Sequence, residues 1–495
     1  MFDKLKQIKW LNVILVLAIS LGAVLVAQLF VLPNMVGWDI NQIKHYEGSN
    51  DIALTYQYEY SKEHLYGHVI SQRICDKDEA CKLDLLISKG QDVSKLPKSE
   101  IQLYLSQLVD EKLILPSNIV YLDSNYSNDV KKDYALSYEP NPYEEKIELS
   151  FSLGQEVHVY EASMVAVGDI LLHDTVYQDF QLTADTYDFT PLFEQITPYL
   201  EPSDFALVNQ ESNIGGASLG VSSYPNFNSP YEIVDTLVES GFNMFSRANN
   251  HTLDKGVDGV LSASKKYEEI QGIVHAGAAS SQTQRDTIPV ITKQGINLSL
   301  LSYTYGFNGH LLPEGMPYLG NLYDAKQVAI DVEKAKEVSD VVVVSMHWGD
   351  EYTSLPNDEQ LKQAQYLADL GVDIIIGHHP HVLQPIDTLI GKNGNETLVV
   401  YSLGNFVSGQ TDLEKNVGGI VKFDIKKMII GQSEPIIEVS NVQFMPTYNY
   451  PKGRYSDYQL VPLIESSQKS YFETVETIMK TYDEDIEVVN YITYN

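Results

Sequence analysis

The feature that most constrains the fold is an alternation, after Val157, of short apolar runs and amphipathic stretches with helical spacing. The apolar runs cover residues 162–167, 205–208, 243–245, 298–302, 341–345, 372–376 and 398–401. The helical stretches between several of them cover residues 230–240, 256–271, 324–338 and 358–370. Strands that alternate with helices of this length predict an α/β domain, in which helices cover both faces of a mainly parallel sheet. Strand-like alternation returns near 436–444, and an acidic, helical-looking tail follows Glu465.

Polar residues follow six of these runs, at the point where each predicted strand ends. They are Gly168-Asp169, Asn209-Gln210-Glu211, Asn249-Asn250-His251 with Asp254 just beyond, His347-Trp348-Gly349-Asp350-Glu351, Gly377-His378-His379-Pro380-His381, and Ser402-Leu403-Gly404-Asn405. The carboxyl ends of parallel strands open on one edge of a sheet, where ligands bind. We therefore expect residues hundreds of positions apart to meet at this edge.

Each of these groups has an ordinary structural interpretation when it is taken alone. A Gly-Asp pair after a strand is usually a turn, Asn-Asn-His often caps a helix, and His347 alone is typical of a satisfied buried histidine. However, five of the twelve histidines lie in three of these loops, beside Asp, Glu and Asn. This coincidence favours one shared site over several separate structural roles.

The types of side chain then constrain what the site binds. Imidazole, carboxylate and amide oxygen without thiolate suit Mn, Fe or Zn in five- or six-fold coordination. There are enough ligands for two ions, and a carboxylate between them can bridge. A two-metal centre lowers the pKa of a bound water and clamps the oxygens of a phosphoryl group. Spare histidines can donate hydrogen bonds or protonate the leaving oxygen.

These motifs, in this order, resemble the bacterial capsule-synthesis protein CapA family, which is associated with poly-gamma-glutamate biosynthesis. The matching stretches are VAVGDILLHDTVY, DFALVNQESNIGG, GFNMFSRANNHTLDKGVDG, VVSMHWGDEY, GVDIIIGHHPHVLQP and VYSLGNFV, within about residues 160–410. The family is similar in fold to calcineurin-like metallophosphoesterases. The resemblance implies a four-layer α/β sandwich of metallophosphoesterase type over residues 160–450, with the metals at one sheet edge, and a C-terminal extension over 451–495.

The resemblance also assigns roles to individual residues. Asp169 would be a first-strand ligand and Glu211 the bridging carboxylate, and His378 competes with His379 for one ligand position. The implied metal ligands are Asp169, Glu211, Asn250, His347, His379 and His381, and the implied catalytic residues are His251, as the hydrogen-bonding acid, and Asp254.

Two departures from the phosphoesterase pattern affect what the resemblance implies. Ordinary enzymes of this fold carry Asp-x-His on the first strand, whereas here the nearest histidine after Asp169 is His173. Their bridging Gly-Asp is replaced by Asn209-Gln210-Glu211. A longer Glu can still bridge two ions, but the metal spacing and the catalytic water change. The resemblance therefore implies metal binding more firmly than phosphatase turnover.

The N-terminus predicts a membrane anchor. Lysines at positions 4, 6 and 9 precede an uncharged stretch from Trp10 to Trp38, longer than the roughly 20 residues that cross a bilayer. We expect a cytoplasmic tail over 1–9, a single transmembrane helix over 10–33, and the rest of the chain outside the cell membrane. A cleaved signal peptide is the competing interpretation, but the site near Ala27 has Leu25 where a small residue is preferred. No Cys follows the apolar run, which excludes a lipoprotein anchor.

Residues 41–145 are expected to form a small, partly helical extracytoplasmic domain without a counterpart in the family. Ile101, Tyr104, Leu105 and Leu108 recur at helical spacing, and residues 121–143 are typical of a linker. No internal repeat is evident in the sequence. The two cysteines, Cys75 and Cys81, favour a local disulfide in an oxidising compartment, with two unpaired thiols as the alternative.

Charge and family together lead to two hypotheses about function. A formal net charge of −33 without a basic cluster beyond the N-terminus excludes nucleic acid as a partner. The first hypothesis is a metal-dependent hydrolase or transferase that acts on a phosphoryl or amide bond of a capsule or wall polymer. The second is a non-catalytic accessory subunit that binds an anionic polymer and recruits a membrane polymer synthase. A weaker third is an amidase that cleaves peptidoglycan.

Overall fold

The structure is a computed structural model. It describes residues 33–50, 54–74 and 83–494, with gaps at 112, 115, 123–126, 128–131, 133–134, 145, 152–154 and 454–455. Except for Pro33, the predicted anchor lies outside the described residues, as do Cys75 and Cys81. Among the helices that are described, none is long and apolar enough to cross a membrane. The chain divides into a smaller unit, which ends at Val157 and includes Ile430–Ser433, and a larger unit of His158–Ile429 and Glu434–Asn495.

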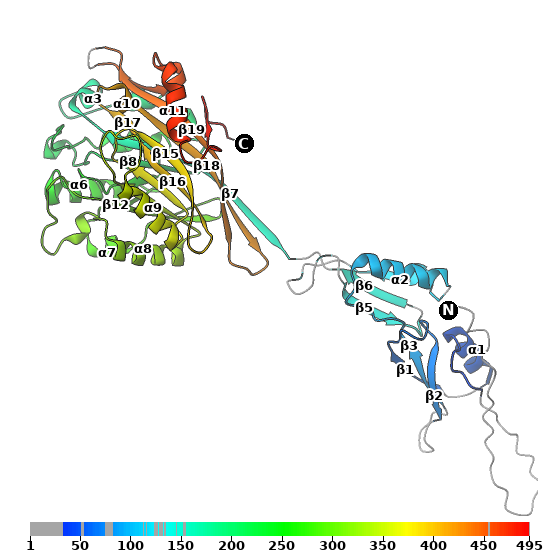
Figure 1. Ribbon diagram of the computed structural model, residues 1–495. Coiled ribbons are helices and arrows are strands. Elements are labelled where there is room, and N and C mark those ends of the chain that lie inside the picture. The colour runs from blue at the N-terminus through cyan, green and yellow to red at the C-terminus, as the bar shows by residue number, and fades with distance from the viewer. Residues whose placement is uncertain are drawn as a thin grey trace, which may run out of the picture. The chain divides into compact units, whose positions relative to one another are not determined.

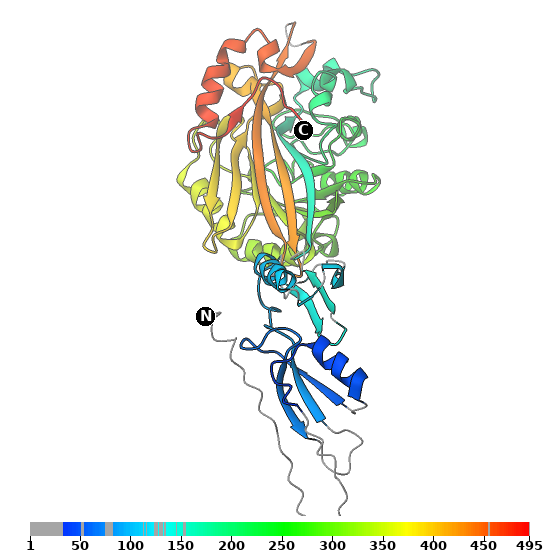
Figure 2. The same ribbon diagram turned by 90° about the vertical axis from the view of Figure 1, so that its right-hand side faces the viewer.

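The first sheet of the larger unit has a parallel half and an antiparallel half (Figure 1). The parallel half consists of β7 (Val157–Leu171), β8 (Phe205–Gln210), β9 (Met244–Ser246) and β10 (Val274–Ala276). On the other side of β7 lie β18 (Val417–Ile430), β19 (Ile436–Pro451) and β20 (Tyr458–Pro462), of which β18, β19 and β20 pair antiparallel. Two short strands join this sheet, β17 (Asn405–Ser408) beside β7 and β21 (Glu487–Val488) beside β19. Figure 2 shows β7 in cyan next to the long orange strands β18 and β19.

The second sheet has a parallel centre with antiparallel edges. Its centre is formed by β12 (Ile296–Thr304), β13 (Val341–His347), β14 (Ile374–His378) and β16 (Glu396–Leu403). The edges are β11 (Val290–Lys293) beside β12 and β15 (Leu383–Ile390) beside β16. Because the centre is parallel, the carboxyl ends of four strands lie along one edge of the sheet.

Alternation along the strands shows how the two sheets pack. Met164 and Ala166 of β7 belong to an apolar cluster that also contains residues of β12, β13 and β14, whereas Val165 and Val167 point to the other face. The outer face of the first sheet packs against α5 (Glu232–Glu239) and α6 (Gly256–Glu268), and that of the second against α8 (Ala325–Val338) and α9 (Asp358–Leu370). The residue pattern alone indicated a single mainly parallel sheet, which is wrong, because two sheets pack against each other and each has helices on its other face. The α/β fold with more than one sheet, which the family resemblance implied, is confirmed.

The four long helices of the larger unit begin and end within a few residues of their predicted positions. Asp324 caps α8 by accepting hydrogen bonds from the backbone of Lys326 and Gln327. Asn357 and Gln360 form a capping box at the start of α9. Shorter helices fill the connections, namely α3 (Asp174–Asp179), α4 (Thr190–Phe193), α7 (Gln282–Asp286) and α10 (Leu413–Asn416). The acidic tail forms α11 (Phe472–Met479), which is as long as α5.

The smaller unit contains a structural repeat. Its first half consists of α1 (Ile40–Asn50), β1 (Leu54–Glu59), β2 (Val69–Ile74) and β3 (Leu83–Ser88), and its second half of α2 (Lys98–Asp110), β4 (Ile119–Tyr121), β5 (Ala135–Asn141) and β6 (Lys146–Phe151). In each half the third strand lies in the centre, parallel to the first strand and antiparallel to the second. The unit is therefore two copies of one helix-and-three-strand module.

Within this unit, one sequence expectation is correct and one is wrong. The helix expected around Ile101–Leu108 is α2, which buries Ile101, Leu105 and Leu108. The stretch 121–143 is not simply a linker, because part of it forms β5, whose Ala135 and Tyr138 are buried. Aromatic contacts join the two modules, since the rings of Tyr60 and Tyr138 stack 6.4 Å apart between centroids.

Candidate metal centre

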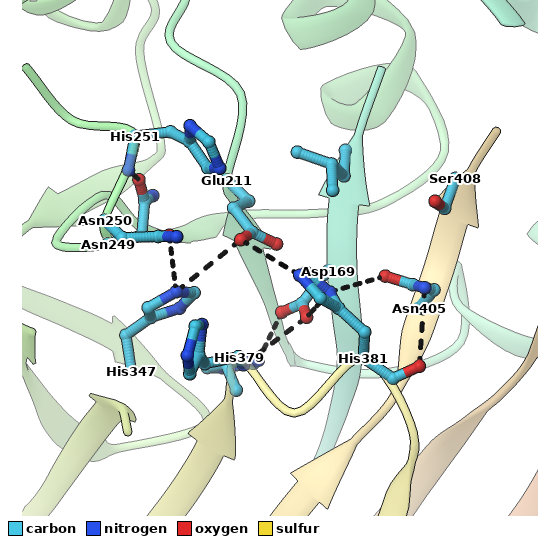
Figure 3. Close-up of polar contacts among 12 residues, drawn as sticks. Asp169, Glu211, Asn249, Asn250, His251, His347, His379, His381, Asn405 and Ser408 are labelled. Carbon is cyan, nitrogen blue, oxygen red and sulfur yellow. Dashed lines mark hydrogen bonds and ion pairs between the residues drawn. The ribbon is translucent and has the colours of Figure 1, made fainter. Parts of the chain in front are cut away.

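The predicted site residues lie at the carboxyl ends of strands from both sheets. Asp169 is near the end of β7, Glu211 directly follows β8, and Asn250 follows β9. His347 is the last residue of β13, and His379 and His381 follow β14. All six side chains are buried and converge in one region (Figure 3). The expectation that these positions meet at a sheet edge is confirmed, although the edge is shared by two sheets.

Two glycines allow the chain to hold Asp169 in place. The Asp169 N–H donates to the carbonyl of Gly404 at 2.9 Å. A Cβ atom on Gly168 would lie only 1.9 Å from that carbonyl oxygen, so only glycine fits there. Gly404 itself has a φ of +64°, which glycine adopts without strain, and it connects β16 of the second sheet to β17 of the first. Asp169 Oδ1 also accepts a hydrogen bond from Asn209 Nδ2 at 2.8 Å.

Glu211 is a fully buried carboxylate near the ends of both sheets. Neither of its oxygens accepts a hydrogen bond from the described residues. Two imidazole nitrogens face Glu211 Oε1, namely Nε2 of His347 at 3.5 Å and Nε2 of His381 at 3.7 Å. Burial raises the pKa of Glu211 well above its usual range. A buried carboxylate costs several kcal/mol unless a cation compensates it, so this position is suited to a metal ion.

His381 connects the two carboxylates. Its Nδ1 lies 3.2 Å from Asp169 Oδ2 and 3.0 Å from Asn405 Oδ1, while its Nε2 faces Glu211. Burial is the largest influence on the pKa of His381 and lowers it, but the two carboxylates together raise the pKa to about 9. With Nδ1–H donating to Asn405, Nε2 is the nitrogen available to a metal.

The other two predicted histidine ligands, His379 and His347, are neutral imidazoles. Burial lowers the pKa of His379 to about 3, and that of His347 well below its usual range. His347 Nε2 lies 2.9 Å from Asn250 Oδ1, so these two predicted ligands are in direct contact. Neutral imidazole is the form that binds a metal.

The loop after β14 is strained where it presents its histidines. His379 has a φ of 98° and His381 a φ of 59°, both in the region that favours glycine. Such conformations cost of order 1–3 kcal/mol each and occur mostly at functional sites. The strain turns successive side chains in different directions, which sequence spacing alone does not reveal.

The donor set fits a metal ion. Among the described residues, Glu211, His379 and His381 form a group of potential ligands whose donor atoms all lie within 4.8 Å of one another. Donor atoms bound to one ion at about 2.0–2.2 Å lie roughly 3–4 Å apart. The contacts of Glu211 with His347 and His381, at 3.5 and 3.7 Å, have this spacing before any adjustment.

His378 and His379 occupy different places. His379 belongs to the group around Glu211, whereas His378 Nδ1 lies 3.4 Å from Asp169 Oδ1. Both ring nitrogens of His378 are buried without a hydrogen-bond partner in the described structure. The geometry thus offers His379 for an ion at Glu211 and His378 for an ion at Asp169, and which of them ligates remains a prediction.

The two predicted catalytic residues lie beside this group rather than in it. His251 Nδ1 is 2.8 Å from Asp254 Oδ2, which also accepts the backbone N–H of Phe227 at 2.6 Å. Asn249 holds the loop, since its Oδ1 accepts the N–H of His251 and its Nδ2 donates to the carbonyl of Gln210. Asp254 thereby orients the imidazole and engages Nδ1, so Nε2 is the atom suited to proton transfer.

His173, the histidine nearest to Asp169 in sequence, does not replace the missing Asp-x-His histidine. Its Nδ1 accepts the N–H of Gly409 at 3.1 Å, and its ring packs against Phe227. Asn209 and Asn405, which sequence reasoning placed in the motifs but gave no role, contact Asp169 and His381 respectively. Each lies just after a predicted strand, and this position is the sequence signal that places them near the site.

Comparison with known proteins identifies the family. The family described as "Bacterial capsule synthesis protein PGA_cap" matches residues 163–410, which is half of the chain. "PGA biosynthesis protein CapA" of Bacillus subtilis is 32% identical over 278 residues, which cover 54% of this chain and 69% of that protein. "Capsule biosynthesis protein CapA" of Bacillus anthracis is 30% identical over 278 residues, which cover 53% of this chain and 64% of that protein.

A distant likeness to a solved structure accompanies these matches. The NAD nucleotidase of Haemophilus influenzae aligns with a TM-score of 0.35 and 12% identity, over 68% of this chain and 65% of that chain. The family match, over residues 163–410, covers all the strand ends that form the candidate metal centre. On these matches, the chain belongs to the bacterial capsule synthesis protein family PGA_cap.

Proposed function

We propose that this protein is a metal-dependent hydrolase or phosphoesterase-like enzyme that acts on a capsule or other cell-surface polymer. The observation that carries the proposal is Glu211, a fully buried carboxylate that no described donor satisfies and that three imidazoles approach. A divalent cation is the group that balances such a site. The names of the Bacillus relatives, which refer to PGA and capsule biosynthesis, support poly-gamma-glutamate as the polymer.

We further propose two ions, of Mn, Fe or Zn, within a four-layer metallophosphoesterase-type sandwich. The two-sheet core with outer helices supports this fold. Glu211, His379 and His381 would hold one ion, and Asp169 with His378 the other, while Asn250 and His347 complete the set. An ion held there supplies positive charge that acidifies a water molecule and stabilises charge on a phosphoryl or carbonyl oxygen.

The surrounding residues then have defined tasks. Asn405 accepts from His381 Nδ1 and so directs Nε2 toward Glu211, while Asn209 donates to Asp169 and fixes its orientation. His251, oriented by Asp254, is positioned to protonate a leaving oxygen or nitrogen through Nε2. These contacts hold proton donors and ligands in place before a substrate arrives.

A non-catalytic accessory role is the second candidate. It is favoured by His173, which turns to the backbone of Gly409 and leaves the first strand without the histidine of ordinary phosphoesterases. In that case the metal site binds an anionic polymer, and the protein serves a membrane polymer synthase.

The experiment uses the full chain purified in detergent. Elemental analysis should find stoichiometric Mn, Fe or Zn, and Glu211→Gln should lose it, while His45→Ala, at an exposed position in α1, should keep it. Wild type without a stoichiometric transition metal would refute both candidates. If metal is present, hydrolysis of bis(4-nitrophenyl) phosphate separates them, because an enzyme loses its rate in His381→Ala and His251→Ala. Equal rates in wild type and both variants would leave only the accessory role.

We also propose that residues 10–33 anchor the protein in the cell membrane, with the larger unit outside. The support is the length of the apolar stretch and the lysines before it. Protease added to intact cells should digest the larger unit, and removal of residues 1–33 should release the protein from the membrane fraction. Protection from protease in intact cells but not in lysed cells would contradict this orientation.

A further inference from the structure

The amide of Asn250 lies between the metal centre and the exposed loop that follows β12. Asn250 is 2% exposed, and its Oδ1 lies 2.9 Å from His347 Nε2. Adjacent donor atoms that bind one ion at about 2.0–2.2 Å lie roughly 3 Å apart. The contact therefore has the spacing of two neighbouring ligands on one ion.

An amide can ligate a cation through only one of its two ends. The oxygen has lone pairs, whereas the nitrogen carries two hydrogens and only donates. If the Asn250 side chain made a half-turn, Nδ2 would replace Oδ1 beside His347, and the centre would lose a ligand. The affinity for an ion at this position therefore depends on which end of the amide faces His347.

Asn308 contacts the nitrogen end of the same amide. Asn250 Nδ2 donates to Asn308 Oδ1 at 3.3 Å. The Tyr305 hydroxyl, which can accept as well, is a second hydrogen-bond partner of the Asn250 amide. Because Nδ2 carries a hydrogen for each acceptor, both contacts favour the orientation in which Oδ1 faces His347.

The backbone brings Asn308 to this point in an unusual conformation. Asn308 has a φ of +49°, in the left-handed region that Asn tolerates better than most residues. Its neighbour Phe307 is buried and packs with Leu253 and Leu319, so the chain is fixed directly before Asn308. Asn308 itself is exposed, so the contact with Asn250, and not burial, accounts for the position of its side chain.

We propose that Asn308 is a positioning residue of the metal centre. It binds the nitrogen of the Asn250 amide and thereby keeps Asn250 Oδ1 directed at the ion. Hydrogen-bond partners of metal ligands typically contribute about 10- to 100-fold to metal affinity. The inference rests on the proposed function, since Asn250 is a predicted ligand there, and it adds a residue that lies outside all the sequence motifs of the site.

The test measures Mn affinity by calorimetry on the full chain purified in detergent. Asn308→Gly removes the side chain without strain, because glycine adopts a φ of +49° freely. It should weaken binding of the ion at Asn250 by about 10-fold.

Gln294→Gly is the matched control. Gln294 is also exposed and also has a φ of +49°, but it precedes β12 and lies at the opposite end of that strand. Its side chain likewise makes a hydrogen bond, to Asp204 Oδ1 at 3.0 Å. Gln294→Gly should therefore bind Mn like wild type, because it removes a similar contact away from the centre.

The variant Asn250→Asp separates positioning from a general structural role. Its carboxylate has two equivalent oxygens, so either end can ligate and no partner is needed to orient it. In this background Asn308→Gly should no longer weaken Mn binding. A loop that merely became looser would weaken binding in both backgrounds.

The proposal is overturned if Asn308→Gly binds Mn like wild type, or if it weakens binding equally in the Asn250→Asp background. Melting temperatures with EDTA should be the same for Asn308→Gly and wild type, because the lost side chain is exposed. A wild type that binds no metal would refute the proposed function together with this inference. Metal binding in wild type that is unchanged in Asn308→Gly would refute the inference alone.

Discussion

The two sheets contribute different halves of the candidate metal centre. The first sheet supplies oxygen donors, from Asp169, Glu211 and Asn250, and the second supplies imidazole nitrogens, from His347, His379 and His381. The oxygen half carries two buried carboxylates, while burial keeps His347 and His379 neutral. Neither half is a metal site alone, so the site depends on the packing of one sheet against the other.

The chain passes directly from the second sheet to the first at Gly404. The chain leaves the second sheet at the end of β16, turns at Gly404, and enters the first sheet as β17 beside Asp169. The position of the carboxylates relative to the histidines is therefore set by one turn as well as by apolar packing. Changes at the carboxylates, at this turn and among the histidines should affect metal binding in different ways.

The largest effect is expected from removing the charge of Glu211. Glu211→Gln should weaken metal binding by about 100-fold or more, because the donors of the second sheet then lack the carboxylate that faces them. The metal-free variant should be at least as stable as wild type, since burial disfavours the charged form of Glu211. Metal titration and thermal melting with and without EDTA measure the two effects. A variant that binds metal like wild type would show that Glu211 is not a ligand.

The turn between the sheets should give the next largest effect. Gly168→Ala places a methyl group 1.9 Å from the carbonyl oxygen of Gly404, so the strands must separate. We expect a loss of about 2–4 kcal/mol in the free energy of unfolding, measured by urea denaturation, together with weaker metal binding. Gly256→Ala is the control, because its added Cβ meets no atom within 4 Å and only its φ of +58° is strained. Gly168 itself does not have a positive φ, so a loss in Gly168→Ala no larger than that in Gly256→Ala would mean that the close contact with Gly404 contributes little.

The two sheets also differ in how well the sequence predicts them. Asp169, Glu211 and His347 could be placed at strand ends because apolar runs and polar residues alternate regularly. That the strands form two sheets could not be predicted from the residue pattern, since Val165 and Val343 belong to equally apolar runs and only pairing separates them. Only the family resemblance implied more than one sheet. The module repeat of the smaller unit was missed because it lies in strand order, which residues 41–145 do not show as sequence similarity.

The sequence also could not predict whether His378 or His379 faces Glu211. Strand spacing predicts that neighbours point to opposite sides, but His379 has a φ of 98°, and this conformation decides its direction. The roles of these residues stay predictions, whereas their positions are now defined.

Substituting His378 and His379 one at a time should show whether the two histidines of the second sheet bind different ions. His379→Ala should weaken binding of the first ion by about 10- to 100-fold, because His379 shares the group around Glu211. His378→Ala should leave that ion in place and affect a second ion at Asp169, which His378 contacts. Titration with Mn, followed by paramagnetic resonance, counts the ions in each variant. The loss of both ions in both variants would mean that the two carboxylates share one centre.

The smallest effect concerns a buried carboxylate at the opposite end of the second sheet. Asp373, just before β14, accepts the N–H of Val342 at 2.8 Å, and burial raises its pKa to about 6. Because the folded pKa lies above the unfolded one, the folded state binds the proton more tightly, and stability falls as pH rises from about 4 to 6. Asp373→Asn should therefore stabilise the protein by about 2 kcal/mol above pH 6 and have no effect below pH 4. Its metal content should equal that of wild type, unlike Glu211→Gln, because the N–H of Val342 donates to this carboxylate and no described histidine influences its pKa. Urea denaturation across this pH range measures the difference, and a stabilisation independent of pH would show that the charge of Asp373 is not its cause.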